Sequence, residues 1–163
     1  MGDDAASASV TPLDRAFIVV GIDGSEGSRA ALRFACDEAR LRGAAVHVVH
    51  AWWAIPELDQ EMAPIGEERG TPVERDAKRM IEAFCLETLG DPSRGLEVDA
   101  VPVQGVAASV ALLEAARGAQ LLVVGSRGAG GFRKLLLGSV SEQCIHHAGC
   151  PVVVVHGGSR AGD

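Results

Sequence analysis

A stretch of glycine and serine residues is the part of the chain best suited to bind an anion. Gly125-Ser-Arg-Gly128 directly follows the apolar run Leu121–Val124, and nine residues later comes Gly138-Ser139-Val140-Ser141, at the start of a helical pattern. Glycine has no Cβ, so backbone N–H groups can approach an anion closely and positive φ is tolerated. A serine hydroxyl can cap a helix or donate to an oxygen ligand. A strand end, glycine amides and a helix N-terminus together predict a phosphate site, and hence a nucleotide ligand.

A second glycine turn follows an earlier apolar run. Phe17–Val20 ends in the turn cluster Gly21-Ile22-Asp23-Gly24-Ser25, and we interpret it as another strand that opens into a turn. In parallel sheets ligands bind beyond the carboxyl ends of the strands, where the strand order reverses. The two strands that end in glycine turns should therefore be neighbours at that crevice, with Asp23 beside Gly125. The alternative is that Asp23 is an ordinary Asx-turn or helix-start residue.

Positive charge gathers around the glycine-serine stretch of an otherwise acidic chain. Arg127, Arg133 and Lys134 lie within it or next to it, against the single acid Glu142 between positions 125 and 143. Arg127, between two glycines, is the better phosphate ligand. For Arg133 and Lys134 a solvated surface position is an equal alternative.

Strand and helix patterns alternate along the chain and would position these turns. Strands separated by helices imply right-handed crossovers and a parallel sheet covered on both faces. One strand alternates in polarity and contains Pro102, which favours a sheet edge. The expected strands are 17–20, 46–51, 96–103, 121–124 and 152–155, and the expected helices are about 28–41, 73–88, 106–116 and 140–148.

Composition limits the function classes. The chain has 163 residues, 47% of them apolar, and a formal charge of −7, which fits one domain and argues against a nucleic-acid partner. The four cysteines form no C-x-x-C pair, so we expect reduced, buried thiols. Residues 1–14 and 157–163 have the composition of disordered tails, leaving 15–156 as the domain. We find no secretory signal or membrane span and expect a cytoplasmic protein without a membrane partner.

Several alternative sites do not fit the pattern. No Gly-Lys-Ser/Thr follows the glycines, so the stretch is not a Walker A loop, and a dinucleotide fingerprint would follow the first strand. His146 and His147 are adjacent and would point about 100° apart on a helix, so a shared metal is not expected. The 20-residue stretch 52–71 has no pattern; it could fold over a nucleotide with Trp52 or Trp53, or the tryptophans could cover core or interface.

The two motifs, at the ends of the first and fourth strands, resemble the universal stress protein family, specifically its ATP-binding branch. The resemblance covers about Phe17 to His156. It implies an adenine-nucleotide alpha-hydrolase-like α/β fold, a three-layer open sheet of five parallel strands in the order 3-2-1-4-5. It also implies that ATP is the ligand, with Mg2+ arriving only together with the phosphates and no metal held by protein side chains alone.

The resemblance also suggests roles for individual residues. Asp23 would accept hydrogen bonds from the nucleoside, Ala51 would lie beside the adenine, and the glycines would cradle the phosphates. Ser139 would donate to them or cap the helix. The full set of expected nucleotide-binding residues is Gly21, Ile22, Asp23, Ala51, Gly125, Arg127, Gly128, Arg133, Gly138, Ser139, Val140 and Ser141.

Two functions remain open from the sequence. One is an ATP-binding stress protein with at most slow hydrolysis or autophosphorylation; the other is a family module that binds AMP or a cyclic nucleotide, or a protein, without ATP chemistry. We see no catalytic base or oriented nucleophile. The strand Val152–Val155 is an apolar edge without blunting charges. Because the family dimerises through this strand, the resemblance implies a homodimer.

Overall fold

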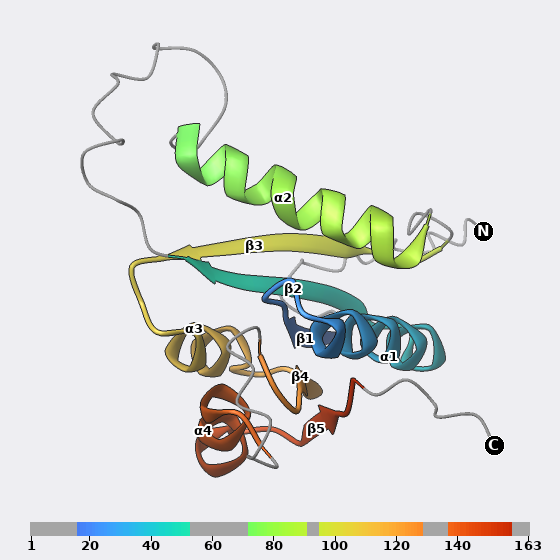
Figure 1. Ribbon diagram of the computed structural model, residues 1–163. Helices are drawn as coiled ribbons and strands as arrows, with labels where there is room; N and C mark the ends of the chain where they lie inside the picture. Colours follow the sequence, from blue (N-terminus) through green and yellow to red (C-terminus); the bar gives the residue numbers. More distant parts are fainter. Residues whose placement is uncertain (1–15, 53–71, 91–94, 129–136, 158–163) are drawn as a thin grey trace, which may run out of the picture.

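Five parallel strands form one sheet in the order β3-β2-β1-β4-β5 (Figure 1). The computed structural model of the protein describes residues 16–52, 72–90, 95–128 and 137–157. The predicted α/β fold and its strand order are confirmed. The strands are β1 (Phe17–Gly21), β2 (Ala45–Trp52), β3 (Val98–Gln104), β4 (Leu121–Gly125) and β5 (Val152–Val155), and the helices are α1 (Glu26–Arg42), α2 (Pro72–Leu89), α3 (Ala108–Ala115) and α4 (Ser139–His147).

β1 lies at the centre of the sheet and marks the point where the strand order reverses. Ile18 of β1 lies opposite Val46 of β2 on one side and Leu121 of β4 on the other. The chain adds β2 and β3 beyond one edge of β1, and then returns to place β4 and β5 beyond the other. The expectation that the first and fourth strands are neighbours is confirmed. The crevice beyond their carboxyl ends is where this kind of fold binds ligands.

Helices cover both faces of the sheet, because successive strand side chains point to opposite sides. On one face Val20 of β1 packs with Leu32 of α1 and Ile81 of α2 in a buried core. On the other face Val19 packs with Leu112 of α3 in a second core, to which α4 also contributes. Figure 1 shows the two helix layers on either side of the strands. The two glycine turns therefore begin at the ends of strands whose sheet is covered by helices on both faces.

The ends of α1 follow from local sequence. Ser25 is its N-cap, and the Ser25 hydroxyl accepts a hydrogen bond from the Ser28 N–H at 3.2 Å. Gly43 ends the helix at φ 64°, in the left-handed region that glycine tolerates best. The helix begins at Glu26, two residues before the expected start. The sequence did not reveal these two residues because the polar first turn carries no apolar period. This first turn becomes part of the candidate site.

The two sheet edges differ in character. β3 contains Pro102 and lies at an edge, as its alternating sequence predicted. β5 forms the other edge, and its four valines are only half-buried although the strand is wholly apolar. Short apolar sequence therefore indicates full burial for β1 and β4, which have neighbours on both sides, but not for β5.

The cysteines are free thiols, as predicted. Cys36, Cys85 and Cys144 are buried, and Cys150 is half-buried. Burial raises the pKa of Cys36, Cys85 and Cys144 to about 11, and it raises the pKa of Cys150 as well. We call the first three the buried thiols. A thiol with so high a pKa is protonated at neutral pH and chemically inert.

Several expectations fall outside the described residues. The structure does not describe the expected tails at 1–14 and 158–163, nor Trp53 and the rest of the stretch up to 71, nor Arg133 and Lys134. Gly157 is described, and it packs so tightly that a Cβ on it would lie 2.6 Å from the Cα of Gly27. In the described part of the chain, no helix combines the length and apolar character needed to cross a membrane.

Candidate ligand-binding site

A cavity of about 610 Å³ opens at the carboxyl ends of β1, β2 and β4, beneath α3 and α4. It lies at the reversal point of the strand order, where the sequence placed the site. Arg133 lies outside the described residues. Every other expected site residue lines this cavity, namely Gly21, Ile22, Asp23, Ala51, Gly125, Arg127, Gly128, Gly138, Ser139, Val140 and Ser141.

The side of the cavity toward β2 and α3 is apolar. Val49 and Ala51 reach it from β2, and Ala108 and Leu112 reach it from α3. These side chains offer no hydrogen-bonding group, so a ligand would meet only backbone polar atoms and small aliphatic surfaces there. This side suits a flat, weakly polar group such as a nucleobase.

The side toward β4 and α4 carries backbone amides and serine hydroxyls beside three apolar side chains, Val124, Leu137 and Val140. The Gly138 N–H donates to the carbonyl oxygen of Ser126 at 2.7 Å, which fixes the start of α4 against the turn after β4. The buried Ser141 hydroxyl donates to Ser126 O at 3.2 Å and to Gly138 O at 2.9 Å. Ser141 therefore ties this loop together, whereas the Ser139 hydroxyl is exposed at the first turn of α4.

The expectation that Ser139 caps the last helix is wrong. The N-cap of α4 is Gly138, with φ −80° and no side-chain cap hydrogen bond, and Ser139 is the first helical residue. The first N–H groups of the helix are therefore not capped by a side chain. Together with the positive end of the helix dipole, they favour an anion at this point.

Glycine is needed in this site for close approach rather than for unusual backbone angles. None of Gly125, Gly128 and Gly138 has a positive φ, contrary to one reason for expecting glycine there. A Cβ on Gly125 would lie 2.9 Å from the backbone carbon of Gly27, and a Cβ on Gly128 would lie 2.7 Å from Oδ2 of Asp23. A Cβ on Gly138 would meet nothing closer than 3.5 Å. The turns after β1 and β4 thus pack directly on each other.

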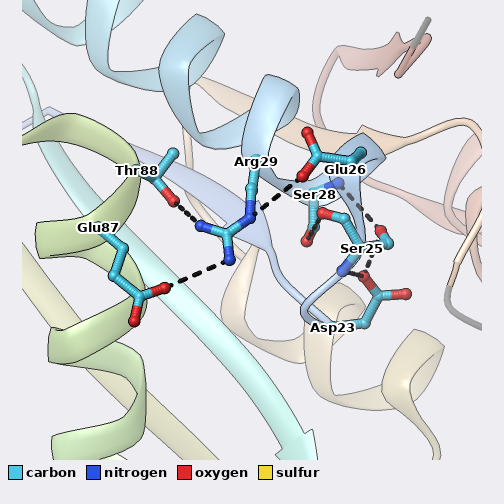
Figure 2. A network of polar contacts seen from close by, with 7 residues as sticks. All are labelled: Asp23, Ser25, Glu26, Ser28, Arg29, Glu87 and Thr88. Atoms are coloured by element: carbon cyan, nitrogen blue, oxygen red, sulfur yellow. Dashed lines mark hydrogen bonds and ion pairs between the residues drawn. The ribbon is translucent and has the colours of Figure 1, made fainter.

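Asp23 forms an Asx turn with Ser25 (Figure 2) and also lines the cavity. Its Oδ1 accepts hydrogen bonds from the Ser25 N–H at 3.0 Å and from the Ser25 hydroxyl at 2.6 Å. Its Oδ2 lies against Gly128. The turn interpretation and the ligand interpretation are therefore compatible, because each carboxylate oxygen has a different neighbour.

The backbone before Asp23 is held by β2. The Ile22 N–H donates to the Val49 carbonyl oxygen at 3.0 Å, and Nδ1 of His50 lies 2.9 Å from the Ile22 carbonyl oxygen. His50 therefore has a backbone hydrogen-bond partner. Among the described residues no group of three or more His, Cys, Asp or Glu side chains could hold a metal ion.

Comparison with known proteins identifies the family. The sequence model of the universal stress protein family matches residues 17–156, which is nearly all of the described chain. The chain belongs to the universal stress protein family. The two glycine motifs therefore predicted the family correctly.

Individual universal stress proteins agree with this assignment. One from Mycolicibacterium smegmatis is 34% identical over 151 residues, covering 88% of this chain and 49% of the relative. One from Thermus aquaticus is 38% identical over 141 residues, covering 85% of this chain and 96% of the relative. The chain thus spans about half the length of the mycobacterial relatives that it matches.

Solved structures of the family share the fold. A universal stress protein in complex with cAMP is 25% identical with a TM-score of 0.60, over 88% of this chain and 98% of that one. One from Archaeoglobus fulgidus in complex with dAMP is 25% identical with a TM-score of 0.58, over 86% and 97%. Both of those proteins were therefore captured with an adenine nucleotide.

The sequence did not point to every residue of this universal stress protein that lines the cavity. Val49 lies two positions before Ala51 on the same face of β2, and Ala108 and Leu112 are four apart on α3, so both pairs follow from strand and helix periods. Nothing in the sequence singled out Ser28. The cavity residues that were not anticipated are Ser28, Val49, Ala108, Leu112, Val124 and Leu137.

Proposed function

We propose that this universal stress protein binds an adenine nucleotide, ATP in the first place, in the cavity between the turns after β1 and β4. The observation that carries the proposal is the polarity of the cavity, apolar beside β2 and α3 and rich in backbone amides at α4. The base lies against Ala51 and Leu112, and the phosphates lie at the N-terminus of α4. Asp23, between the two sides, accepts hydrogen bonds from the ribose.

Cations support the phosphate end. Arg127 is exposed between Gly125 and Gly128 and lines the cavity. Its side chain is long enough to reach phosphate oxygens beyond the amides, and a guanidinium binds them in a forked geometry. Mg2+ enters only with the phosphates of ATP. Hydrolysis is at most slow, and the protein acts by holding the nucleotide.

Nucleotide binding can be tested by its effect on the stability of the folded protein. Ligand that binds only the folded state stabilises it by about 2.7 kcal/mol at a hundredfold excess over the dissociation constant. We expect ATP to raise the melting temperature, and mass spectrometry to detect an adenine nucleotide released from the purified protein. An absence of both effects would contradict the proposal.

AMP or a cyclic nucleotide is the second candidate ligand. It is favoured by the two family members in complex with dAMP and cAMP. Titration with ATP, AMP and cAMP separates the candidates. Tighter binding of ATP supports contacts from the amides of α4 to the outer phosphates, whereas equal affinities restrict the recognition to the nucleoside and the first phosphate.

We further propose that two copies pair through β5 in a cytoplasmic homodimer, with residues 15–156 as the folding unit and Gly157 packed against it at Gly27. The Leu122 N–H donates to Pro151 O, and the Ser126 N–H donates to Val155 O, so alternate residues of β5 bond to β4. The backbone groups of Val152 and Val154 consequently point to the open edge. An apolar edge of this kind is stabilised when another strand covers it. Light scattering that finds a monomer at tens of micromolar would contradict the dimer.

A further inference from the structure

Arg29, in the second turn of α1, is the centre of a polar network between α1 and α2 (Figure 2). Its Nη1 donates to the Thr88 hydroxyl at 3.0 Å, and its Nη2 donates to Oε2 of Glu87 at 3.3 Å. Its Nε lies 3.5 Å from Oε1 of Glu26, and the guanidinium carbon lies 4.6 Å from the ring centre of Phe84. One side chain thus contacts three residues of α2.

Hydrogen bonds join this turn of α1 to residues that line the cavity. The Arg29 N–H donates to the Ser25 carbonyl oxygen at 3.1 Å, and the Ser28 hydroxyl donates to that oxygen at 2.8 Å. Ser25 in turn donates twice to Oδ1 of Asp23, and both Ser28 and Asp23 line the cavity. The side chain of Arg29 therefore bonds α2 while its backbone bonds the turn that holds the Asp23 carboxylate, and the covalent chain of Arg29 joins the two sets of contacts.

We propose that Arg29 is a positioning residue for the nucleoside end of the cavity. It fixes the first turns of α1 on α2, and through Ser25 it fixes the direction of the Asp23 carboxylate. This inference rests on the proposed nucleotide binding. It adds that α2, none of whose described side chains lines the cavity, influences affinity there.

The burial of Arg29 sets it apart from other arginines of α1. Its side chain is 24% exposed, and Thr88, its partner, is buried. Arg42, at the other end of α1, pairs with Glu38 at 2.8 Å and is 42% exposed. Arg42 makes an ion pair within one helix and lies far along α1 from the cavity turn. It is therefore a matched control for charge and helix context.

The test measures nucleotide affinity in three variants well below their melting temperatures. Arg29→Met removes the whole network, Thr88→Val removes one acceptor while keeping its shape, and Arg42→Met is the control. We expect the dissociation constant for AMP to rise about tenfold in Arg29→Met, less in Thr88→Val, and not in Arg42→Met. Affinity for inorganic triphosphate, which lacks the nucleoside, should stay unchanged in all three.

A double-mutant cycle shows whether Arg29 acts through Asp23. In an Asp23→Asn background, Arg29→Met should cause no further loss of AMP affinity, because the group that it positions has already been altered. Additive losses would overturn the proposal. Equal AMP affinity in wild type and Arg29→Met, with only a lower melting temperature, would overturn it as well, because that is the result of a merely structural role.

A measurement without ligand separates this inference from the proposed function. Amide hydrogen exchange of Ser25 and Ser28 reports on the turn directly, since both N–H groups donate within it. We expect faster exchange at these two amides in Arg29→Met and not in Arg42→Met. If the wild type bound no nucleotide, the proposed function would fail, and unchanged exchange in Arg29→Met would refute the positioning role on its own.

Discussion

Gly128→Ala should weaken nucleotide binding because of a contact with Asp23. The new Cβ would lie 2.7 Å from Oδ2 of Asp23, closer than a carbon and an oxygen atom can approach without repulsion. The carboxylate cannot simply swing away, because its Oδ1 is held by the N–H and the hydroxyl of Ser25. Either these hydrogen bonds break or the loop after β4 moves away from the turn after β1.

The expected loss of nucleotide affinity in Gly128→Ala equals the contribution of the Asp23 hydrogen bond. Displacing Asp23 removes a hydrogen bond that the nucleoside donates to a charged acceptor, which costs about 1.5 to 3 kcal/mol. That loss corresponds to a dissociation constant about 10 to 150 times higher. Overpacking should also lower the free energy of unfolding, by about 1 to 3 kcal/mol.

Calorimetric titration with ATP and urea unfolding measure the two effects. Gly149→Ala is the structural control, since its Cβ would meet no atom within 4 Å and should leave stability nearly unchanged. In an Asp23→Ala background the stability cost of Gly128→Ala should largely disappear, while affinity stays low. A steric conflict between position 128 and Asp23 is excluded if Gly128→Ala binds ATP like the wild type, or if its stability cost is the same without Asp23.

Three further predictions concern stability and assembly. Because burial raises the pKa of the buried thiols from 9.0 to about 11, their contribution to stability is complete below pH 9.0 and lost as the pH rises toward 11. The urea midpoint should fall over that interval, and replacing all three thiols by alanine should flatten the fall. Gly157→Ala should lower the free energy of unfolding by about 1 to 3 kcal/mol, because its Cβ would lie 2.6 Å from backbone atoms of Gly27. Gly149→Ala, with open space around its Cβ, should change the free energy of unfolding by less than about 0.5 kcal/mol. A similar loss in both glycine variants would contradict this account of close packing. Val154→Pro removes an N–H that points to the open edge of β5, so light scattering should find monomers in this variant and dimers in the wild type; dimers in both would exclude pairing through that edge.

Much of the architecture was predictable because apolar periods and glycine turns are local signals. The runs at 17–20 and 121–124 are short and wholly apolar, which indicated two buried strands, and their glycine turns predicted that these strands are neighbours. The reversal of strand order between these two neighbours then predicted the position of the ligand site. Helix starts were less accurate, because the first turn of α1 consists of polar and small residues without an apolar period.

The contacts between distant turns could not be predicted from local patterns. Gly128 packs on the Asp23 carboxylate and Gly125 packs on the backbone of Gly27, so these glycines are required by tertiary approach and not by positive φ. The assignment of Ser139 as a helix cap was wrong because α4 begins at Ser139 itself, one residue earlier than that role requires. Arg29 carried no motif, and only the packing of α1 on α2 reveals its connection to the site.

In the proposed complex an adenine nucleotide lies across the cavity, with its base toward β2 and its phosphates at α4. Amide and methyl chemical-shift mapping by NMR during titration with ATP locates the bound nucleotide. We expect saturable shifts at the amides of Gly128 and Ser139 and at the methyl groups of Ala51 and Leu112. Shifts at other surfaces alone, or none at millimolar ATP, would contradict it.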